Sequence, residues 1–200
     1  MGLTDKSNRT KRGIHHLSHP ANTSESINSS ISEPYRTISY STISETVLAI
    51  QEFGDRCLLV KHDFKSAFRH IPVSPLDTPL LGFYWDGLYY EEQFLPFGLR
   101  TATYIFNLFA EIFHWILEYK LQQHGLRAKI LHYLDDFLIV LPPTADTNIY
   151  STIFDKTCTQ VRLTIKESKN KHGTATSFGG IEIDTERKVI GLPQKKLLKA

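Results

Sequence analysis

The 200-residue sequence has few cysteines, no long apolar run and no excess of one charge. Its two cysteines, Cys57 and Cys158, form neither a CxxC pair nor a disulfide framework, so we expect a reducing compartment. No stretch reaches the roughly 20 apolar residues of a transmembrane helix, and the polar, basic N-terminus has neither a secretory signal nor a transit peptide. We therefore expect an intracellular protein of the cytoplasm or nucleus, not secreted and without a membrane partner.

The overall charge does not indicate a partner. The 23 Lys and Arg residues nearly balance the 21 Asp and Glu residues, although the last forty residues are more basic than the rest. Hydrophobic residues make up 41% of the chain and aromatic residues 12%, which is enough to build a core and excludes disorder for most of it. We expect one large domain, or a domain with a partial neighbour.

Hydrophobic periodicity predicts a mixture of helices and strands after a polar N-terminal segment. Thr42 and Glu45 have capping-box spacing at the start of a predicted helix over about 43–53. Apolar residues at spacings of three and four predict a longer helix over about 101–125, and another is expected over 147–161. Short apolar runs predict strands at 57–62, 81–84, 88–94, 130–133, 137–141, 177–183 and 189–192.

Three carboxylates interrupt strongly apolar strands. Asp63 follows one such run, and Asp135 and Asp136 lie at the turn of a predicted hairpin. An Asp pair there is often only a turn, but a carboxylate near a core is costly unless it is paired, hydrogen-bonded or bound to metal. If the strands lie side by side, repulsion among three carboxylates favours a divalent cation, and oxygen ligands favour Mg²⁺. Two Mg²⁺ ions about 4 Å apart suit nucleotidyl transfer.

Three motifs, in order along the chain, resemble those of reverse transcriptases. Asp63–Phe68 (DFKSAF) resembles the first palm motif, Leu95–Leu99 (LPFGL) through Phe106 the second, and Tyr133–Asp136 (YLDD) the Tyr-x-Asp-Asp hairpin. Any one of them occurs by chance in other proteins, whereas the three in register make residues 12–192 resemble the fingers-palm region of an RNA-directed DNA polymerase. The resemblance implies an α+β fold with an antiparallel palm sheet backed by helices, partial fingers and a missing thumb.

The resemblance also implies a division of the chain. We expect a polar tail over 1–11, partial fingers over 12–62, a palm over 63–192, and the start of a truncated thumb connection over 193–200.

The same resemblance assigns catalytic roles to the carboxylates. Asp63 and Asp135 are expected to hold two Mg²⁺ ions, for which Mn²⁺ can substitute, while Asp136 assists the charge balance. Tyr133 is expected near the primer. The implied partners are an RNA or DNA template with a primer, and dNTPs; the oligomeric state is left open.

Nucleotide-binding roles are implied for five residues outside the carboxylate group. Phe68 lies where reverse transcriptases place an aromatic gate that excludes a 2′-hydroxyl, although a Phe there can also be ordinary core. The remaining four are Phe97 and Gly98 beneath the incoming nucleotide, Arg12 at the triphosphate, and Lys169 as a general acid for pyrophosphate. Plainer interpretations are a turn at Gly98, a solvated Arg12, and a solvated lysine run in which Lys166 and Lys171 fit the motif nearly as well as Lys169.

The N-terminal segment resembles one subgroup of retroelements. Arg12–Pro20 (RGIHHLSHP) is similar to the fingers segment of DIRS-like retrotransposons, which carry a tyrosine recombinase. Its three histidines, His15, His16 and His19, could be considered as zinc ligands, but no Cys lies near and alternate residues of a strand point to opposite faces. We expect no zinc site there.

Two departures from the family pattern and two alternatives belong with this hypothesis. Thr103 replaces a usual Pro, and Gly179 replaces a Leu in the predicted strand over 177–183, where it would weaken packing. One alternative is a non-catalytic retroelement fragment that folds and binds nucleic acid weakly. Another two-metal enzyme, such as a palm-type cyclase, would not explain Phe68 and Leu95–Leu99 together.

Overall fold

The computed structural model describes residues 2–5, 11–21 and 24–193. The chain forms two compact units, each built from two segments: Met1–Ile38 with Ser66–Leu108, and Ser39–Lys65 with Phe109–Ala200. The boundary expected between fingers and palm, at residues 62 and 63, falls inside one strand, β3 (Leu58–Asp63). The units are therefore not consecutive stretches of the chain.

The second unit is built on an antiparallel sheet with the strand order β6-β7-β3-β8. Its two central strands, β3 and β7 (Asp136–Leu141), are buried along nearly their whole length, and both are apolar runs apart from Lys61, His62 and the aspartates at their ends. Such runs are expected where both faces of a sheet are covered. The outer strands are β6 (Lys129–Tyr133) and β8 (Lys171–Gly173).

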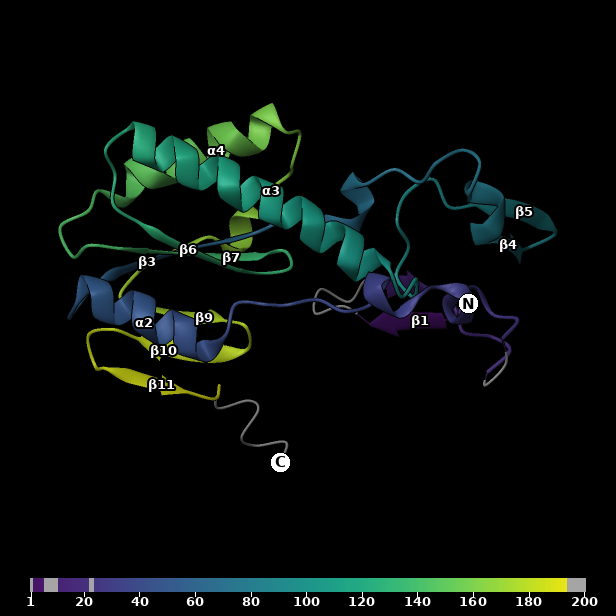
Figure 1. The fold of residues 1–200 in the computed structure, drawn as a ribbon, viewed down its shortest axis with the longest axis horizontal. Helices are drawn as coiled ribbons and strands as arrows, with labels where there is room; N and C mark the ends of the chain where they lie inside the picture. The colour runs from purple at the N-terminus through teal and green to yellow at the C-terminus, as the bar shows by residue number, and fades with distance from the viewer. Residues whose placement is uncertain (1, 6–10, 22–23, 194–200) are drawn as a thin grey trace. The chain divides into compact units, whose positions relative to one another are not determined.

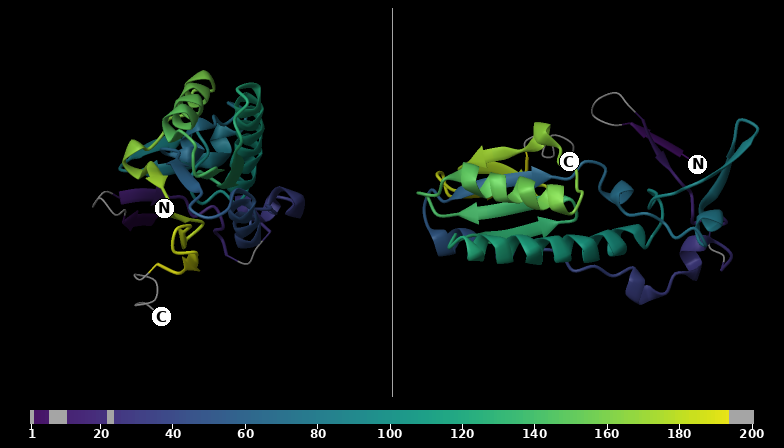
Figure 2. Two further views of the ribbon diagram at one scale, coloured as in Figure 1. Left: turned by 90° about the vertical axis from the view of Figure 1, so that its left-hand side faces the viewer. Right: turned by 90° about the horizontal axis from the view of Figure 1, so that it is seen from above.

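Helices cover one face of this sheet, and a helix with a second sheet covers the other (Figures 1 and 2). Toward α3 (Ala102–Gln123) and α4 (Thr147–Gln160), Phe113, Phe137 and Phe154 pack edge to face with ring centroids 5.2–6.1 Å apart. On the other face, α2 (Ile43–Phe53), β9 (Ala175–Phe178) and β10 (Ile181–Asp184) enclose Leu138 and Val140. Because side chains alternate along β7, this one strand supplies both cores.

Local signals predicted most of these elements correctly. Helix α2 begins after Thr42, whose side chain accepts from the Glu45 backbone N–H at 3.1 Å while the Glu45 carboxylate accepts from the Thr42 N–H at 2.6 Å. The mixed α+β architecture with an antiparallel sheet backed by helices is confirmed. In the part of the chain that the structure describes, no helix has the length and apolar character needed to cross a bilayer.

The strand predicted over 177–183 is wrong, because the chain turns back within it. β9 (Ala175–Phe178) and β10 (Ile181–Asp184) form a hairpin that β11 (Val189–Gly191) extends. The two-residue loop is Gly179-Gly180, with φ of 55° and 85°, and positive φ at both positions is what a tight hairpin of this kind requires. Gly179 therefore makes the turn possible rather than weakening a strand.

The first unit contains short hairpins joined by turns. β1 (Gly2–Asp5) pairs with β2 (Lys11–Ile14), so the tail expected over 1–11 is partly structured. The hairpin predicted around Asp86-Gly87 is confirmed as β4 (Gly82–Trp85) and β5 (Leu88–Glu91). The remaining short helices are α1 (Ile27–Ser30), η1 (Glu33–Tyr35), η2 (Ala67–His70) and η3 (Thr78–Leu81), with η4 (Glu167–Lys169) in the second unit.

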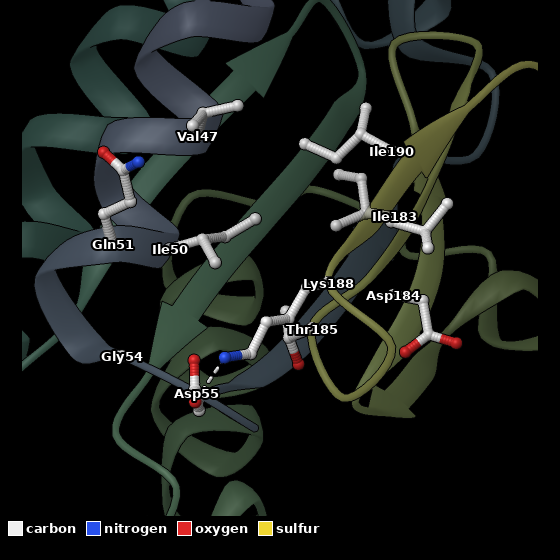
Figure 3. Close-up of a pocket in the computed structure, with 11 residues that line it drawn as sticks. Val47, Ile50, Gln51, Gly54, Asp55, Ile183, Asp184, Thr185, Lys188 and Ile190 are labelled. Atoms are coloured by element: carbon white, nitrogen blue, oxygen red, sulfur yellow. Dashed lines mark ion pairs between the residues drawn. The ribbon is translucent and has the colours of Figure 1, made fainter.

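A partly apolar pocket of about 360 Å³ lies between α2 and the β10–β11 hairpin in the second unit (Figure 3). Ile50, Ile183 and Ile190 line it, and an ion pair of 2.7 Å joins Lys188 Nζ to Asp55 at its rim. A second carboxylate at this pocket, Asp184, accepts from the backbone N–H groups of Glu186 and Arg187.

The buried His62 side chain is expected to make the free energy of unfolding depend on pH. Its ring is 1% exposed and stacks on Phe154 at 3.8 Å, and burial lowers its pKa to about 4. The unfolded chain, with an ordinary pKa of 6.5, therefore binds a proton more readily, so stability is full above pH 6.5 and falls toward pH 4. We expect the His62 contribution to lose about 2 kcal/mol between pH 6.5 and 5.

Urea unfolding of wild type and His62→Phe at both pH values measures this loss. The free energy of unfolding of the variant should fall less than that of wild type over this interval. Equal falls in the two proteins would show that His62 does not cause the dependence.

Candidate active site

Strand pairing brings the three predicted carboxylates to one end of the second unit's sheet. Asp63 ends β3 and Asp136 begins β7, and the antiparallel register makes these two residues direct cross-strand partners. Tyr133 pairs with Asp136 across the β6–β7 hairpin, which leaves Leu134 and Asp135 as its two-residue loop. The expectation that this hairpin carries the paired carboxylates at its turn is confirmed.

The backbone around the carboxylates is held by hydrogen bonds from three segments. The Phe64 N–H donates to the Asp135 carbonyl at 3.0 Å, and the Lys166 N–H donates to the Asp63 carbonyl at 2.8 Å. Leu134 has a φ of 53°, a left-handed conformation that costs a non-glycine residue about 1–2 kcal/mol. Such conformations persist where the surroundings enforce them, as they do in this tight hairpin.

Two lysines pair with the carboxylates. Lys169 Nζ lies 2.5 Å from Asp63 Oδ2, and Lys61 Nζ lies 2.9 Å from Asp136 Oδ2 and donates to the Ser177 carbonyl at 2.6 Å. Of the three lysines considered from the sequence, Lys169 is therefore the one with an ion pair to Asp63 here. Lys61 was missed, although a Lys inside an apolar strand was a visible signal.

Burial is the main cause of the raised pKa values of Asp135 and Asp136. Burial and the charge of Asp63 raise the pKa of Asp135. Burial also raises the pKa of Asp136, and the ammonium of Lys61 only partly opposes this. Burial favours the neutral form of Lys169, but the Asp63 carboxylate outweighs it and raises the pKa of the lysine.

The donor atoms fit a hard divalent cation. Asp136 Oδ1 is buried and accepts no hydrogen bond from the described residues, so it has a lone pair available for a ligand. The neighbouring donors are carboxylate oxygens, which Mg²⁺ and Mn²⁺ prefer. A cation bound there would relieve the repulsion that raises the pKa of Asp135.

Tyr133, expected near the primer, lies at the edge of the same group. Its side chain is 41% exposed, and its ring packs on Tyr40 with centroids 4.3 Å apart. Burial raises the pKa of Tyr40, and the charge interaction with Tyr133 adds a smaller effect in the same direction. The exposed part of the Tyr133 ring therefore presents an aromatic surface to solvent beside the β6–β7 hairpin.

In the first unit, Phe68 belongs to a small aromatic group. It lies on η2 just after Ser66, which has a φ of 56°, and its ring is 5.1 Å from Phe97 and 5.8 Å from Phe106 between centroids. Phe68 and Phe97 are each half-buried, whereas Phe106 is fully buried. The two predicted nucleotide-binding rings therefore contact each other, and the buried Phe106 ring supports Phe68.

Gly98 lies in a loop that the first unit builds around Asn28. The buried Asn28 side chain donates to the Gly98 carbonyl at 2.8 Å and accepts from the Arg100 N–H at 2.8 Å, while the His15 N–H donates to the Phe97 carbonyl at 2.9 Å. Gly98 has a φ of 103°, and a Cβ there would overlap the backbone carbonyl of His15. The close approach that requires glycine at position 98 is therefore made by the His15 backbone of the same chain. Asn28 was not singled out from the sequence.

We expect Gly98→Ala to destabilise the protein by at least about 3 kcal/mol, because it combines a strained φ with a backbone collision. Thermal unfolding measures the effect. Gly191→Ala is the matched control, since no atom lies within 4 Å of a Cβ at that position. An unchanged melting temperature for Gly98→Ala would contradict the loop described here.

Arg12, predicted at the triphosphate, has its backbone in β2. Its side chain lies outside the described part of the structure. Nearby, His15 Nε2 contacts Glu92 Oε1 at 2.8 Å, and Arg69 pairs with the same carboxylate, whose pKa this pairing lowers. His15 therefore has a protein partner in the first unit.

An antiparallel sheet backed by helices, with carboxylates at a strand end and the adjacent hairpin, defines the class as a palm-type polymerase fold. The family model for "Reverse transcriptase (RNA-dependent DNA polymerase)" matches residues 9–193. The chain belongs to this reverse transcriptase family. Members of the family generally depend on divalent metal ions. A search of curated proteins gives no match.

Solved reverse transcriptases share the fold. A foamy viral protease-reverse transcriptase in complex with double-stranded DNA matches with a TM-score of 0.75 and 14% identity, over 98% of this chain and 31% of that one. The same viral enzyme with an RNA/DNA hybrid matches with a TM-score of 0.59 and 18% identity, over 76% and 19%. Telomerase from Candida albicans, with a fragment of telomeric RNA, matches with a TM-score of 0.55 and 14% identity, over 82% and 36%. The chain thus spans about a third or less of the viral enzymes.

Proposed function

We propose that this chain is the polymerase core of a reverse transcriptase, which joins dNTPs to a primer 3′-hydroxyl on an RNA or DNA template. The observation that carries the proposal is the pairing of Asp63 with Asp136 beside the Asp135 turn, in a chain that belongs to the reverse transcriptase family. The solved viral relatives in complex with double-stranded DNA and with an RNA/DNA hybrid support a template-primer as the partner.

In this proposal Asp63 and Asp135 hold two Mg²⁺ ions, which Mn²⁺ can replace, and Asp136 completes the charge balance. When bound, the ions make the primer hydroxyl a better nucleophile and stabilise the leaving pyrophosphate. The support is the charge crowding at Asp135 and the buried Asp136 oxygen without a hydrogen bond from the described residues.

Two lysines then have distinct roles. Lys61 positions Asp136, because its ammonium is fixed between Asp136 Oδ2 and the Ser177 carbonyl. Lys169 keeps its proton at neutral pH, since its pKa is raised, and is proposed as the general acid that protonates pyrophosphate. An ammonium within reach of Asp63 suits both charge neutralisation and proton donation.

The remaining roles follow the family motifs. Phe68 is proposed as the ring that excludes a 2′-hydroxyl, Phe97 and Gly98 as the support of the nucleotide, Arg12 as a triphosphate contact, and Tyr133 as a primer contact. The contact between the Phe68 and Phe97 rings supports the first two roles. We further propose a DIRS-like retrotransposon as the source and the cytoplasm or nucleus as the location.

Binding and extension of a labelled primer on an RNA template test the function. We expect wild type to bind the duplex and extend the primer with dNTPs only when Mg²⁺ or Mn²⁺ is added, and Asp63→Asn to bind without extending. Asp155→Asn is the control, because burial also raises the pKa of Asp155, which lies on α4 outside the group of three carboxylates. Binding without extension by folded wild type would favour the alternative, a non-catalytic nucleic-acid-binding protein.

A further inference from the structure

A second cluster of metal-ligating side chains joins α3 to β6 in the second unit. Glu111 and His114 lie three residues apart on α3 and therefore share one face of the helix. His132 lies on β6, in the sheet that α3 covers (Figure 1). His114 Nδ1 is 3.1 Å from His132 Nδ1, and Glu111 Oε1 is 3.4 Å from His132 Nε2.

We propose that Glu111, His114 and His132 bind a Zn²⁺ ion, with water in the fourth position. One ligand atom from each residue lies within 4.8 Å of the other two. Tetrahedral zinc with ligands at about 2.0–2.2 Å needs its ligand atoms about 3.3 Å apart, so binding through one nitrogen of His132 requires side-chain rotations that bring the three ligand atoms closer together. Two imidazoles and one carboxylate form a ligand set that zinc commonly uses.

The burial of the cluster is graded from the sheet to the solvent. His132 is buried and His114 is half-buried, so the two imidazoles lie on the inner side of the cluster. The Glu111 side chain is 55% exposed, which gives the ion a negative charge on the solvent side and a path of entry.

The site is separate from the catalytic carboxylates. His132 precedes Tyr133 in β6, and neighbouring side chains of a strand point to opposite faces. The His132 ring stacks on Phe137 with centroids 5.0 Å apart, whereas Tyr133 packs on Tyr40. A zinc ion here would tie the helix to the edge strand of the hairpin that carries Asp135.

Without a metal, the two Nδ1 atoms of His114 and His132 share a hydrogen bond, and the Glu111 carboxylate lies beside His132 Nε2. Titration of the full chain with Co²⁺, a spectroscopic substitute for zinc, separates the two cases. Excess Mg²⁺ keeps the catalytic carboxylates occupied. We expect the visible absorption of tetrahedral Co²⁺, its loss on adding Zn²⁺, and micromolar or tighter binding.

The variants identify the ligands. His114→Ala should weaken binding by more than the roughly 10–100-fold typical of losing an outer-shell partner, and Glu111→Ala by at least about tenfold. His124→Ala, just after the end of α3 and outside the cluster, should bind as wild type does. Equal affinity in all four proteins, or no Co²⁺ spectrum for wild type, would overturn the proposal.

If His114→Ala folds poorly, thermal unfolding of wild type and Glu111→Ala still tests the proposed site. Zn²⁺ should raise the melting temperature of wild type, because a ligand that binds only the folded state stabilises it. Glu111→Ala changes an exposed side chain and should fold normally, yet its melting temperature should respond much less. The same rise in wild type and Glu111→Ala would also contradict the site.

Discussion

Asp135→Asn should reduce Mg²⁺-dependent primer extension by at least ~10³-fold while leaving the protein folded and as stable as, or more stable than, wild type. The first effect follows from the proposed role of Asp135 as a metal ligand. The second follows from its surroundings, because burial and the charge of Asp63 already raise the pKa of this carboxyl. A neutral side chain of the same shape removes that repulsion.

Extension rates and thermal unfolding of the same preparations measure both effects. Asp155→Asn, whose carboxyl pKa burial also raises, should keep wild-type activity. Loss of activity together with loss of stability would indicate a structural role. Full activity of Asp135→Asn would remove the residue from the proposed metal site.

Phe68→Ala should lower the preference for dNTPs over NTPs by roughly 10–200-fold, the range in which one steric contact discriminates. The change removes the ring that is proposed to occupy the space of a 2′-hydroxyl. It should affect incorporation of NTPs far more than incorporation of dNTPs, because the mutation adds room without adding a hydrogen bond to either.

The ratio of kcat/KM for dTTP and UTP measures this preference. Phe68→Tyr, which keeps the ring, is the control and should retain the wild-type preference. Phe68 also contacts Phe97 and Phe106, so unfolding of each variant must be followed in parallel. Equal discrimination in wild type and a folded Phe68→Ala would mean that Phe68 is ordinary core.

Elements with local signals were predictable. The capping box at Thr42 and Glu45 requires only neighbouring residues, and the Asp86-Gly87 turn specifies its own hairpin. The carboxylate arrangement was partly predictable, because Asp63 and Asp136 lie at ends of apolar strands that a single sheet was expected to hold.

Long-range pairings were not predictable from local patterns. Nothing near Lys171 indicates that β8 pairs with β3, and the ion pair of Lys169 with Asp63 joins segments 106 residues apart. The collision that requires Gly98 involves His15, and the Glu111–His132 contact involves a helix and a strand. In each case the interaction depends on tertiary packing rather than on spacing in the chain.

The hairpin at Gly179-Gly180 shows how a family pattern can mislead. Comparison with the family strand made Gly179 a weak substitute for Leu, whereas two consecutive glycines are themselves a turn signal. The turn is formed because both residues adopt positive φ, which is most easily accommodated by glycine.

Incorporation of dTTP on poly(rA)/oligo(dT) by the wild-type chain, with Mg²⁺ or Mn²⁺, tests the central claim most directly. We expect incorporation that requires the metal and is absent from Asp135→Asn at matched folding. No incorporation by a folded wild-type protein, with either metal, would contradict the proposal that this chain is a reverse transcriptase core in its own right.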